Sequence, residues 1–221
     1  MARFEVHEVE GVHYVDLVLN NETVRAEAGS LSYLEGNISV HSKLIPSIPG
    51  AIKSVLAMQA VYRPTYTGTG VVTLLSSLGG FHIMDLDEES WILERGTYWA
   101  SEGGVDLALH REPLWTSLRT GEGFVDYKTK LTGTGKAIFN TIGPVDEISL
   151  DNQVFLIEED LVIGRTEGLA YKVRFVGKSL WSKLLSNEKV MRLFEGTGKV
   201  LITRAPFYRM RLLKAAERKS S

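Results

Sequence analysis

The amino-acid sequence predicts an all-β protein in which three internal repeats form one body around a pseudo-threefold axis. Most of the chain alternates apolar with polar residues and is rich in valine, isoleucine, tyrosine, phenylalanine and threonine, as half-buried strands are. The tripeptide Gly-Thr-Gly begins at Gly68, Gly133 and Gly196, so its copies are 65 and 63 residues apart. Such a period marks a repeated architecture.

The composition bounds the class of protein. The chain has 221 residues, of which 44% are hydrophobic and 24% charged, and its net charge is −2. These values are ordinary for a soluble globular protein and give no attraction to nucleic acid. Because the chain has no cysteine, disulfides and thiolate chemistry are excluded. The charged N-terminus does not resemble a signal peptide, so we expect a cytoplasmic protein.

Further markers recur in the same order as Gly-Thr-Gly. A shift of 67 residues places Leu19–Val40 on Leu86–Leu107, and the dipeptide Glu-Gly recurs at 35–36, 102–103 and 167–168. We therefore predict one compact β body over residues 1–205, with repeats at about 1–66, 67–131 and 132–205, followed by a basic helix over 206–221.

The expected strands follow one another along the whole chain. Each is bounded by glycine, aspartate or asparagine, which are typical of turns. In chain order they cover residues 12–19, 70–77, 90–99, 124–131, 136–143, 153–163 and 171–177.

Between the strands, one segment per repeat has the apolar spacing of a short helix. These inserts are residues 48–59, 112–123 and 178–189. Most of their apolar side chains suit a core, but any that remain exposed at one end of the body would form an interaction patch. The candidates for contact with a partner protein or a membrane surface are Leu56, Met58, Trp115 and Trp181.

The C-terminal segment consists of good helix formers and carries several positive charges. A basic helix binds phosphates or an anionic membrane surface, and Arg209 and Arg211 are the candidate residues for such contact. The alternative is a solvated helix that docks its apolar side on the body.

The glycines themselves allow two readings. On a strand, residues i and i+2 share a face, so each Gly-Thr-Gly leaves a bare patch on an apolar face, where another backbone or a ring can approach. Phosphate binding needs a helix directly after the glycines, whereas strand-like sequence follows here. We therefore assign a structural role to all six glycines, which are Gly68, Gly70, Gly133, Gly135, Gly196 and Gly198.

Other candidate chemistry is weak. The acidic run at 85–90 could hold a metal, but asparagine and glutamine stand at matching positions in other repeats, which indicates a turn. The five histidines form no close ligand pair. Hydrolase, nucleotide-binding and dinucleotide-binding motifs are missing, so we expect no catalytic residue, no metal ligand and no cofactor.

Taken together, these motifs resemble a widespread family of unknown function that includes the mitochondrial-biogenesis "altered inheritance of mitochondria" protein. The similarity covers Asn20 to Arg204 and rests on the ordered segments AEAGSLSYLEGNISV, YTGTGVVTL, WILERGTYWAS, LTGTGKAIFNTIGPVDEISL and KSLWSKLL with FEGTGKVLITR. The resemblance implies a triplicated β fold like that of the tryptophan RNA-binding attenuation protein, a double-stranded β-helix type. It implies no catalytic residue, and RNA or tryptophan binding does not follow from the fold.

The sequence thus favours a non-enzymatic scaffold or protein-interaction module that associates with itself or with another protein. The alternative is a small-ligand-binding protein or metal-dependent enzyme with a site between the repeats. No nucleic-acid partner is expected.

Overall fold

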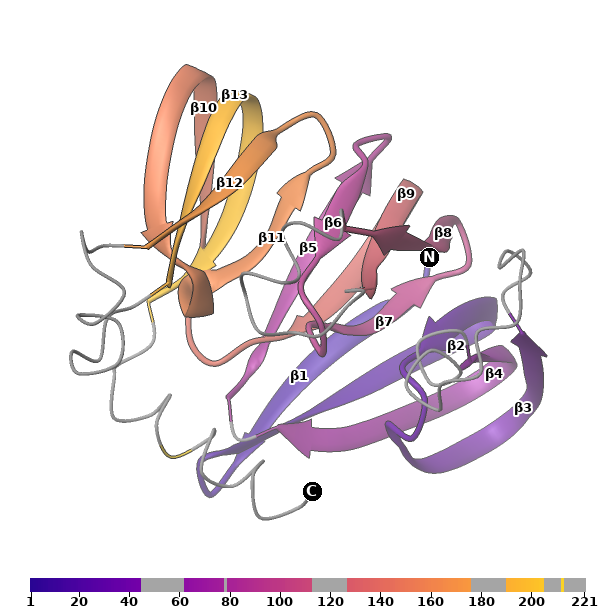
Figure 1. Ribbon diagram of the computed structural model, residues 1–221. Helices are drawn as coiled ribbons and strands as arrows, with labels where there is room; N and C mark the ends of the chain where they lie inside the picture. Colours follow the sequence, from indigo (N-terminus) through magenta and orange to yellow (C-terminus); the bar gives the residue numbers. More distant parts are fainter. Residues whose placement is uncertain (45–61, 78, 113–126, 176–189, 205–211, 213–221) are drawn as a thin grey trace.

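The computed structural model describes residues 1–44, 62–77, 79–112, 127–175, 190–204 and 212. Within these residues the protein is nearly all β, with no helix of seven residues or more (Figure 1). The three expected inserts lie outside the described residues, apart from Glu112. So does the expected C-terminal helix, apart from Leu212.

Thirteen strands and one 3₁₀ turn make up the described part of the chain. They are β1 (Arg3–Val9), β2 (Val12–Ala26), β3 (Leu31–Leu44), β4 (Tyr62–Ser77), β5 (Phe81–Asp87), β6 (Trp91–Leu93), β7 (Tyr98–Glu102), β8 (Val105–Arg111), β9 (Tyr127–Asn140), β10 (Val145–Glu158), η1 (Glu159–Leu161), β11 (Val162–Thr166), β12 (Ala170–Phe175) and β13 (Val190–Thr203).

All of these strands belong to one antiparallel sheet, in which nine follow the order β10-β13-β11-β6-β9-β7-β2-β4-β3. The other four pair off this path, β1 with β2, β5 and β8 with β9, and β12 with β13. In chain order they fall into a first strand group (β1–β4), a second (β5–β9) and a third (β10–β13). In each group the last strand is central: β4 pairs with β2 and β3, β9 with β5 to β8, and β13 with β10 to β12. The repeat boundaries predicted at 66/67 and 131/132 fall inside β4 and β9. The pseudo-threefold axis stays a prediction.

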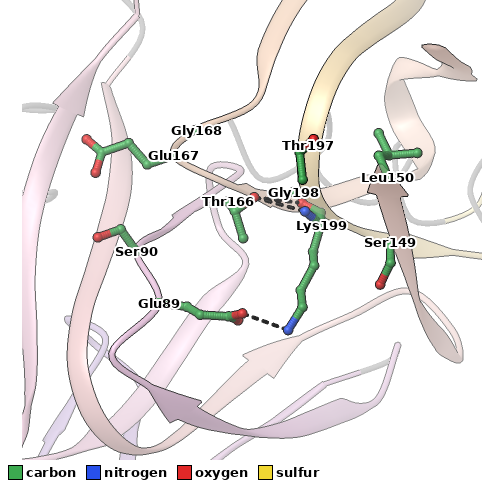
Figure 2. Close-up of a pocket in the computed structure, with 10 residues that line it drawn as sticks. All are labelled: Glu89, Ser90, Ser149, Leu150, Thr166, Glu167, Gly168, Thr197, Gly198 and Lys199. Atoms are coloured by element: carbon green, nitrogen blue, oxygen red, sulfur yellow. Dashed lines mark hydrogen bonds and ion pairs between the residues drawn. The ribbon is translucent and has the colours of Figure 1, made fainter. Parts of the chain in front are cut away.

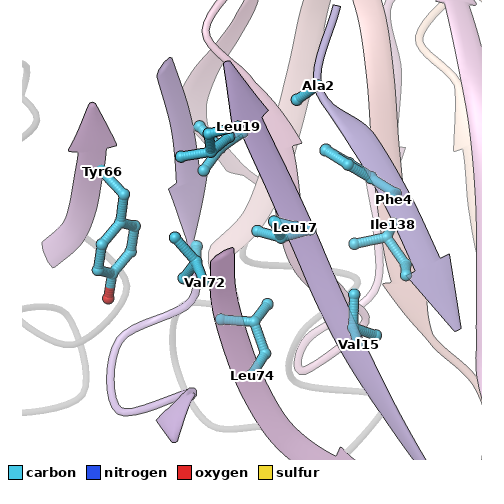
Figure 3. Close-up of a cluster of buried hydrophobic side chains, with 12 residues drawn as sticks. Ala2, Phe4, Val15, Leu17, Leu19, Tyr66, Val72, Leu74 and Ile138 are labelled. Atoms are coloured by element: carbon cyan, nitrogen blue, oxygen red, sulfur yellow. The ribbon is translucent and has the colours of Figure 1, made fainter. Parts of the chain in front are cut away.

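Alternating apolar residues bury one face of each strand group. In β2 the side chains of Val15, Leu17 and Leu19 are buried, whereas Asn20 and Asn21 at the following bulge are exposed. Figure 3 shows the first-group core, to which Phe4 of β1 and Ala2, just before β1, contribute. Two further clusters centre on Trp91 and Phe139 in the second group and on Phe194 in the third. Each cluster is thus centred on one strand group, and the first two also take side chains from the next group, Ala100 and Ile138 in the first and Ile163 and Leu201 in the second.

Two predicted strands are each broken once. The segment 90–99 turns after β6, where Thr97 N–H donates to Glu94 O at 3.2 Å, and the chain re-enters the sheet as β7. The segment 153–163 is interrupted by η1. In both cases a short polar stretch lies at the break, as one also does within the single strand β2, so the pattern alone could not show that the segment serves two strands.

The six glycines of the three Gly-Thr-Gly copies all have positive φ, between 96° and 155°. Gly70 shows the consequence most directly. A Cβ on Gly70 would lie 2.0 Å from the carbonyl oxygen of Glu35 in the neighbouring strand β3. At Gly68, Gly70 and Gly133 the missing side chain lets the adjacent backbone approach within the sheet, whereas a Cβ on Gly135 or Gly198 would meet side chains.

Short ladders join one strand group to the next. Strand β2 pairs with β7 at Val24–Ala26, and β6 pairs with β11 at Trp91–Leu93. In the first junction Gly103 N–H donates to Thr23 O at 2.9 Å. In the second, Glu167 N–H donates to Ser90 O at 2.9 Å. The two junctions thus share the same strand register and the same type of backbone hydrogen bond.

Within the described residues, no helix is long and apolar enough to cross a membrane.

Candidate functional site

A buried ionic cluster joins the second and third strand groups. The ammonium of Lys128, whose side chain is 1% exposed, lies 2.9 Å from the carboxylate of Glu94. The guanidinium of Arg192 also contacts Glu94 and lies 2.5 Å from Glu159. These four residues come from β9, the β6–β7 turn, β13 and η1. Local turns therefore supply the carboxylates, and the central strands supply the cations.

The cluster continues toward β11 and β12. Arg165 donates to the buried carboxylate of Glu112 at 3.0 Å, and its guanidinium lies 4.8 Å from the ring centre of Tyr171. Lys128 and Arg192 each lie 5.5 Å from the same ring. Three cations around one aromatic ring, each with a carboxylate partner, form a neutralised network.

The charges determine the titration of the cluster. Burial by itself would raise the pKa of Glu94, but the ammonium of Lys128 and the guanidinium of Arg192 together hold it below its ordinary value. Burial raises the pKa of Tyr171, and the carboxylate of Glu112 raises it further. At neutral pH Glu94 is therefore ionised and Tyr171 keeps its proton.

A smaller version of this arrangement lies at the first junction. Buried Arg63 of β4 lies 3.1 Å from the carboxylate of Glu27 and 4.3 Å from the ring centre of Tyr98. Burial raises the pKa of Tyr98 to about 12. Its hydroxyl lies 3.0 Å from the hydroxyl of Ser101. A cation, a carboxylate and a tyrosine thus lie at both junctions.

These charged groups are paired with one another. Every cation named above has a carboxylate within 3.1 Å. In the described part of the chain no three histidine, aspartate or glutamate side chains are placed to hold a metal ion. The arrangement is suited to fixing the strand groups relative to each other.

An open pocket of about 670 Å³ lies beside the second junction (Figure 2). It is lined by Glu89, Ser90, Ser149, Leu150, Thr166, Glu167, Gly168, Thr197, Gly198 and Lys199. Across it the ammonium of Lys199 lies 2.7 Å from Glu89, and the hydroxyl of Thr166 accepts from Lys199 N–H at 2.9 Å. Glu167 is paired with Lys130, which lowers the pKa of Glu167. The pocket offers small polar groups but no assembled catalytic set.

The outer strands of the sheet carry exposed apolar side chains. On β3 these are Tyr33 (49% exposed) and Val40, and on β10 they are Val154 (66%) and Leu156. Strands β7 and β11, which are joined to a neighbouring group, are almost entirely buried. The two ends of the sheet therefore expose residue types that are covered at the junctions.

The six residues predicted to contact partners all lie outside the described residues. They are Leu56, Met58, Trp115, Trp181, Arg209 and Arg211. Of the six glycines, only Gly198 lines the pocket. In the acidic run, Asp85 pairs with Lys136 at 2.9 Å and Glu89 with Lys199, so both carboxylates stabilise neighbouring strands.

Sequence reasoning missed the buried ionic cluster. The signal was a basic residue soon after each insert, at Arg63, Lys128 and Arg192. A lone basic residue at the start of a strand is ordinarily solvated, so its burial could not be predicted without knowing which turn faces it.

Comparison with known proteins adds the family. The chain is 23% identical over 190 residues to an uncharacterised protein of Streptococcus pyogenes serotype M6, which covers 81% of this chain and 76% of that protein. The crystal structure of a Streptococcus pyogenes protein determined by structural genomics is similar in fold, with a TM-score of 0.70 and 18% identity. The match covers 99% of this chain and 100% of that one.

These relatives carry no assigned function, and no finding indicates enzymatic activity. The sequence profile of the mitochondrial biogenesis AIM24 family matches residues 4–204. That match spans all thirteen strands except the first residue of β1. The chain therefore belongs to the mitochondrial biogenesis AIM24 family.

Proposed function

We propose that this protein is a non-enzymatic scaffold that associates with copies of itself through the ends of its β sheet. The observation that carries the proposal is the exposure of apolar side chains on β3 and β10. A long sheet edge with apolar side chains readily pairs with another strand. The paired charges of the buried cluster support a structural rather than a catalytic role.

The proposal includes a cytoplasmic location, which the absence of cysteine supports because thiol-free chains need no oxidising compartment. Contact with another protein or a membrane surface through the inserts or the basic tail remains a prediction, because those residues lie outside the described part of the chain.

Light scattering of the purified full chain tests the proposal. We expect the average mass to rise above that of the 24.6 kDa monomer as the protein concentration increases from micromolar to hundreds of micromolar. The rise should survive 0.5 M salt, because apolar and main-chain contacts are not screened. A mass that stays at one chain over the whole range would overturn the proposal.

The open pocket supports a second candidate, namely binding of a small polar ligand between strand groups. Its lining combines hydroxyls, carboxylates and the ammonium of Lys199. A screen of small metabolites by thermal shift, with Lys199→Met as the comparison, tests it. A hit that raises the melting temperature of both proteins equally would contradict binding in this pocket.

A further inference from the structure

The two junctions within the chain have one register, which the Gly-Thr-Gly copies make visible. Val24 lies opposite Tyr66, and Trp91 lies opposite Leu131. Tyr66 and Leu131 each stand two residues before a Gly-Thr-Gly. Val24 and Trp91 also pair with the next strand group, Val24 with Glu102 at the first junction and Trp91 with Thr166 at the second.

In the third strand group, β10 corresponds to the segments around Val24 and Trp91, but no further strand group follows it in the described part of the chain. Phe194 stands two residues before the last Gly-Thr-Gly, and Phe155 of β10 lies opposite it. Phe155 is therefore the counterpart of Val24 and Trp91. Among the described residues, β10 pairs with β13 and with no other strand.

The first strand group contains β3, which corresponds to β7 and β11, the strands that pair with the preceding strand group at the internal junctions. Strands β3, β7 and β11 each contain a register shift, after which Tyr33, Ala100 and Gly164 lie opposite the residue three positions beyond a Gly-Thr-Gly. Two residues further along β3 is Glu35, which is therefore the counterpart of Glu102 and Thr166. In the described part of the chain, β3 pairs with β4 and with no other strand.

The burial of β7 and β11, compared with β3, shows that β3 has no strand beside its outer edge among the described residues. Residues 98–102 and 162–166 are almost all buried, whereas residues 31–35 are exposed or half-buried at every position. Figure 1 shows β10 and β3 at opposite ends of the sheet, so one chain does not bring them together. A strand with one ladder unsatisfied and apolar side chains is a template for another chain.

We infer that β10 of one copy pairs with β3 of a second copy in the register of the internal junctions. Phe155 then lies opposite the second copy's Glu35, Leu156 opposite Leu34, and Ile157 opposite Tyr33. The carbonyl oxygen of Val154 accepts from Gly36 N–H, as Thr23 and Ser90 accept at the internal junctions. This inference rests on the proposed self-association and names the surface that performs it.

The contact is heterologous, because the two copies use different surfaces. Two joined copies together leave one β10 and one β3 open, so the assembly continues head to tail until it closes into a ring or remains a filament. The same pairing that builds one chain from three strand groups thereby builds an assembly from many chains.

Single cysteines test the register, since the wild-type chain has none. A chain with Glu35→Cys is mixed with a chain with Phe155→Cys and oxidised mildly. Opposite residues in an antiparallel pair lie about 4.5 to 5.5 Å apart, within reach of a disulfide. We expect a cross-linked heterodimer in non-reducing electrophoresis. Val40→Cys, further along β3, replaces Glu35→Cys in the control and should give at least ~10-fold less product.

Three outcomes separate the two proposals. A heterodimer with the register shown supports both. If the wild type self-associates but the Glu35 and Phe155 pair gives no more product than the control, the inference is wrong and the proposed function stands. If the wild type is monomeric and the chain carrying both cysteines closes within itself, both are wrong, because β10 and β3 then meet inside one molecule.

Discussion

At the scale of single residues, the protein uses buried charges and bare backbone where a simpler β protein uses apolar side chains. The buried cations Lys128 and Arg192 share the carboxylate of Glu94. Removing one partner leaves an uncompensated buried charge, which costs more than the pair gains. Substitutions of the buried charged residues that hold the strand groups together should therefore have the largest effects on stability.

Replacing Glu94 by Gln should lower the free energy of unfolding by about 3 kcal/mol at pH 7, because Lys128 and Arg192 lose a shared counter-ion. The pKa of Glu94 lies below its ordinary value, so its contribution is present above the unfolded pKa of about 4.3 and is lost as the pH falls through the folded pKa. The difference between wild type and Glu94→Gln in urea titrations should therefore shrink below about pH 4.

The control for this prediction is Glu195→Gln, which removes an exposed ion pair with Lys172. Its effect on the free energy of unfolding should stay below about 1 kcal/mol. Equal effects of the two substitutions would contradict a special role for the buried cluster.

Gly70 tests the close approach of backbones. We expect Gly70→Ala to destabilise the protein by about 3 kcal/mol or more, because its φ is 151° and the added Cβ meets the carbonyl oxygen of Glu35. Gly11 also has positive φ, but nothing lies within 4 Å of its Cβ position. Gly11→Ala should therefore cost only about 1 kcal/mol in the same denaturant titration.

At the scale of elements, each strand group places its longest ladders on its last strand. Strands β4, β9 and β13 pair on both sides, whereas β3 and β10 each pair on one side within the described residues. Backbone amides that are bonded on both edges open only with larger units of structure. The central strands are thus the stable frame, and the outer strands are the accessible part.

Hydrogen exchange measured by mass spectrometry checks this ranking. At low micromolar concentration, peptides from β4, β9 and β13 should exchange most slowly, and peptides from β3 and β10 faster. On concentration, β3 and β10 should gain protection and β1, which pairs with β2 alone in the described residues, should not. Equal gains in all three would point to non-specific association.

At the scale of the whole molecule, three strand groups joined by like junctions form a sheet with two unlike ends. A chain whose β10 is blocked can still accept through β3, so it ends an assembly. In the register inferred above, the backbone of Leu156 faces away from β13, and a proline there removes an outward N–H that the monomer does not need.

Adding a fourfold excess of Leu156→Pro to the wild type should therefore reduce the mean mass seen by light scattering. Leu156→Ala removes most of the same side chain but keeps the N–H, so it should reduce the mean mass much less than Leu156→Pro does. Circular dichroism of each variant alone confirms folding. If both variants shorten the assemblies equally, the contact depends on the side chain and not on the strand pairing.

The sequence by itself determined the class, the family and the position of the glycines. Alternation and β-branched residues are local properties, so they survive without coordinates, and Gly-Thr-Gly marks the central strand of each group. The breaks at Glu94 and η1 and the burial of Lys128 and Arg192 did not follow from the sequence. They depend on which turn faces which strand.

The tertiary structure alone decided what lies at the ends of the sheet. Strands β3 and β7 hold corresponding positions in their strand groups, yet residues 31–35 of β3 are exposed or half-buried and residues 98–102 of β7 are almost all buried. The difference lies in their neighbours: β2 covers β7, while the β10 that would cover β3 lies at the far end. Burial is a property of the pair, so no reading of either strand could assign it.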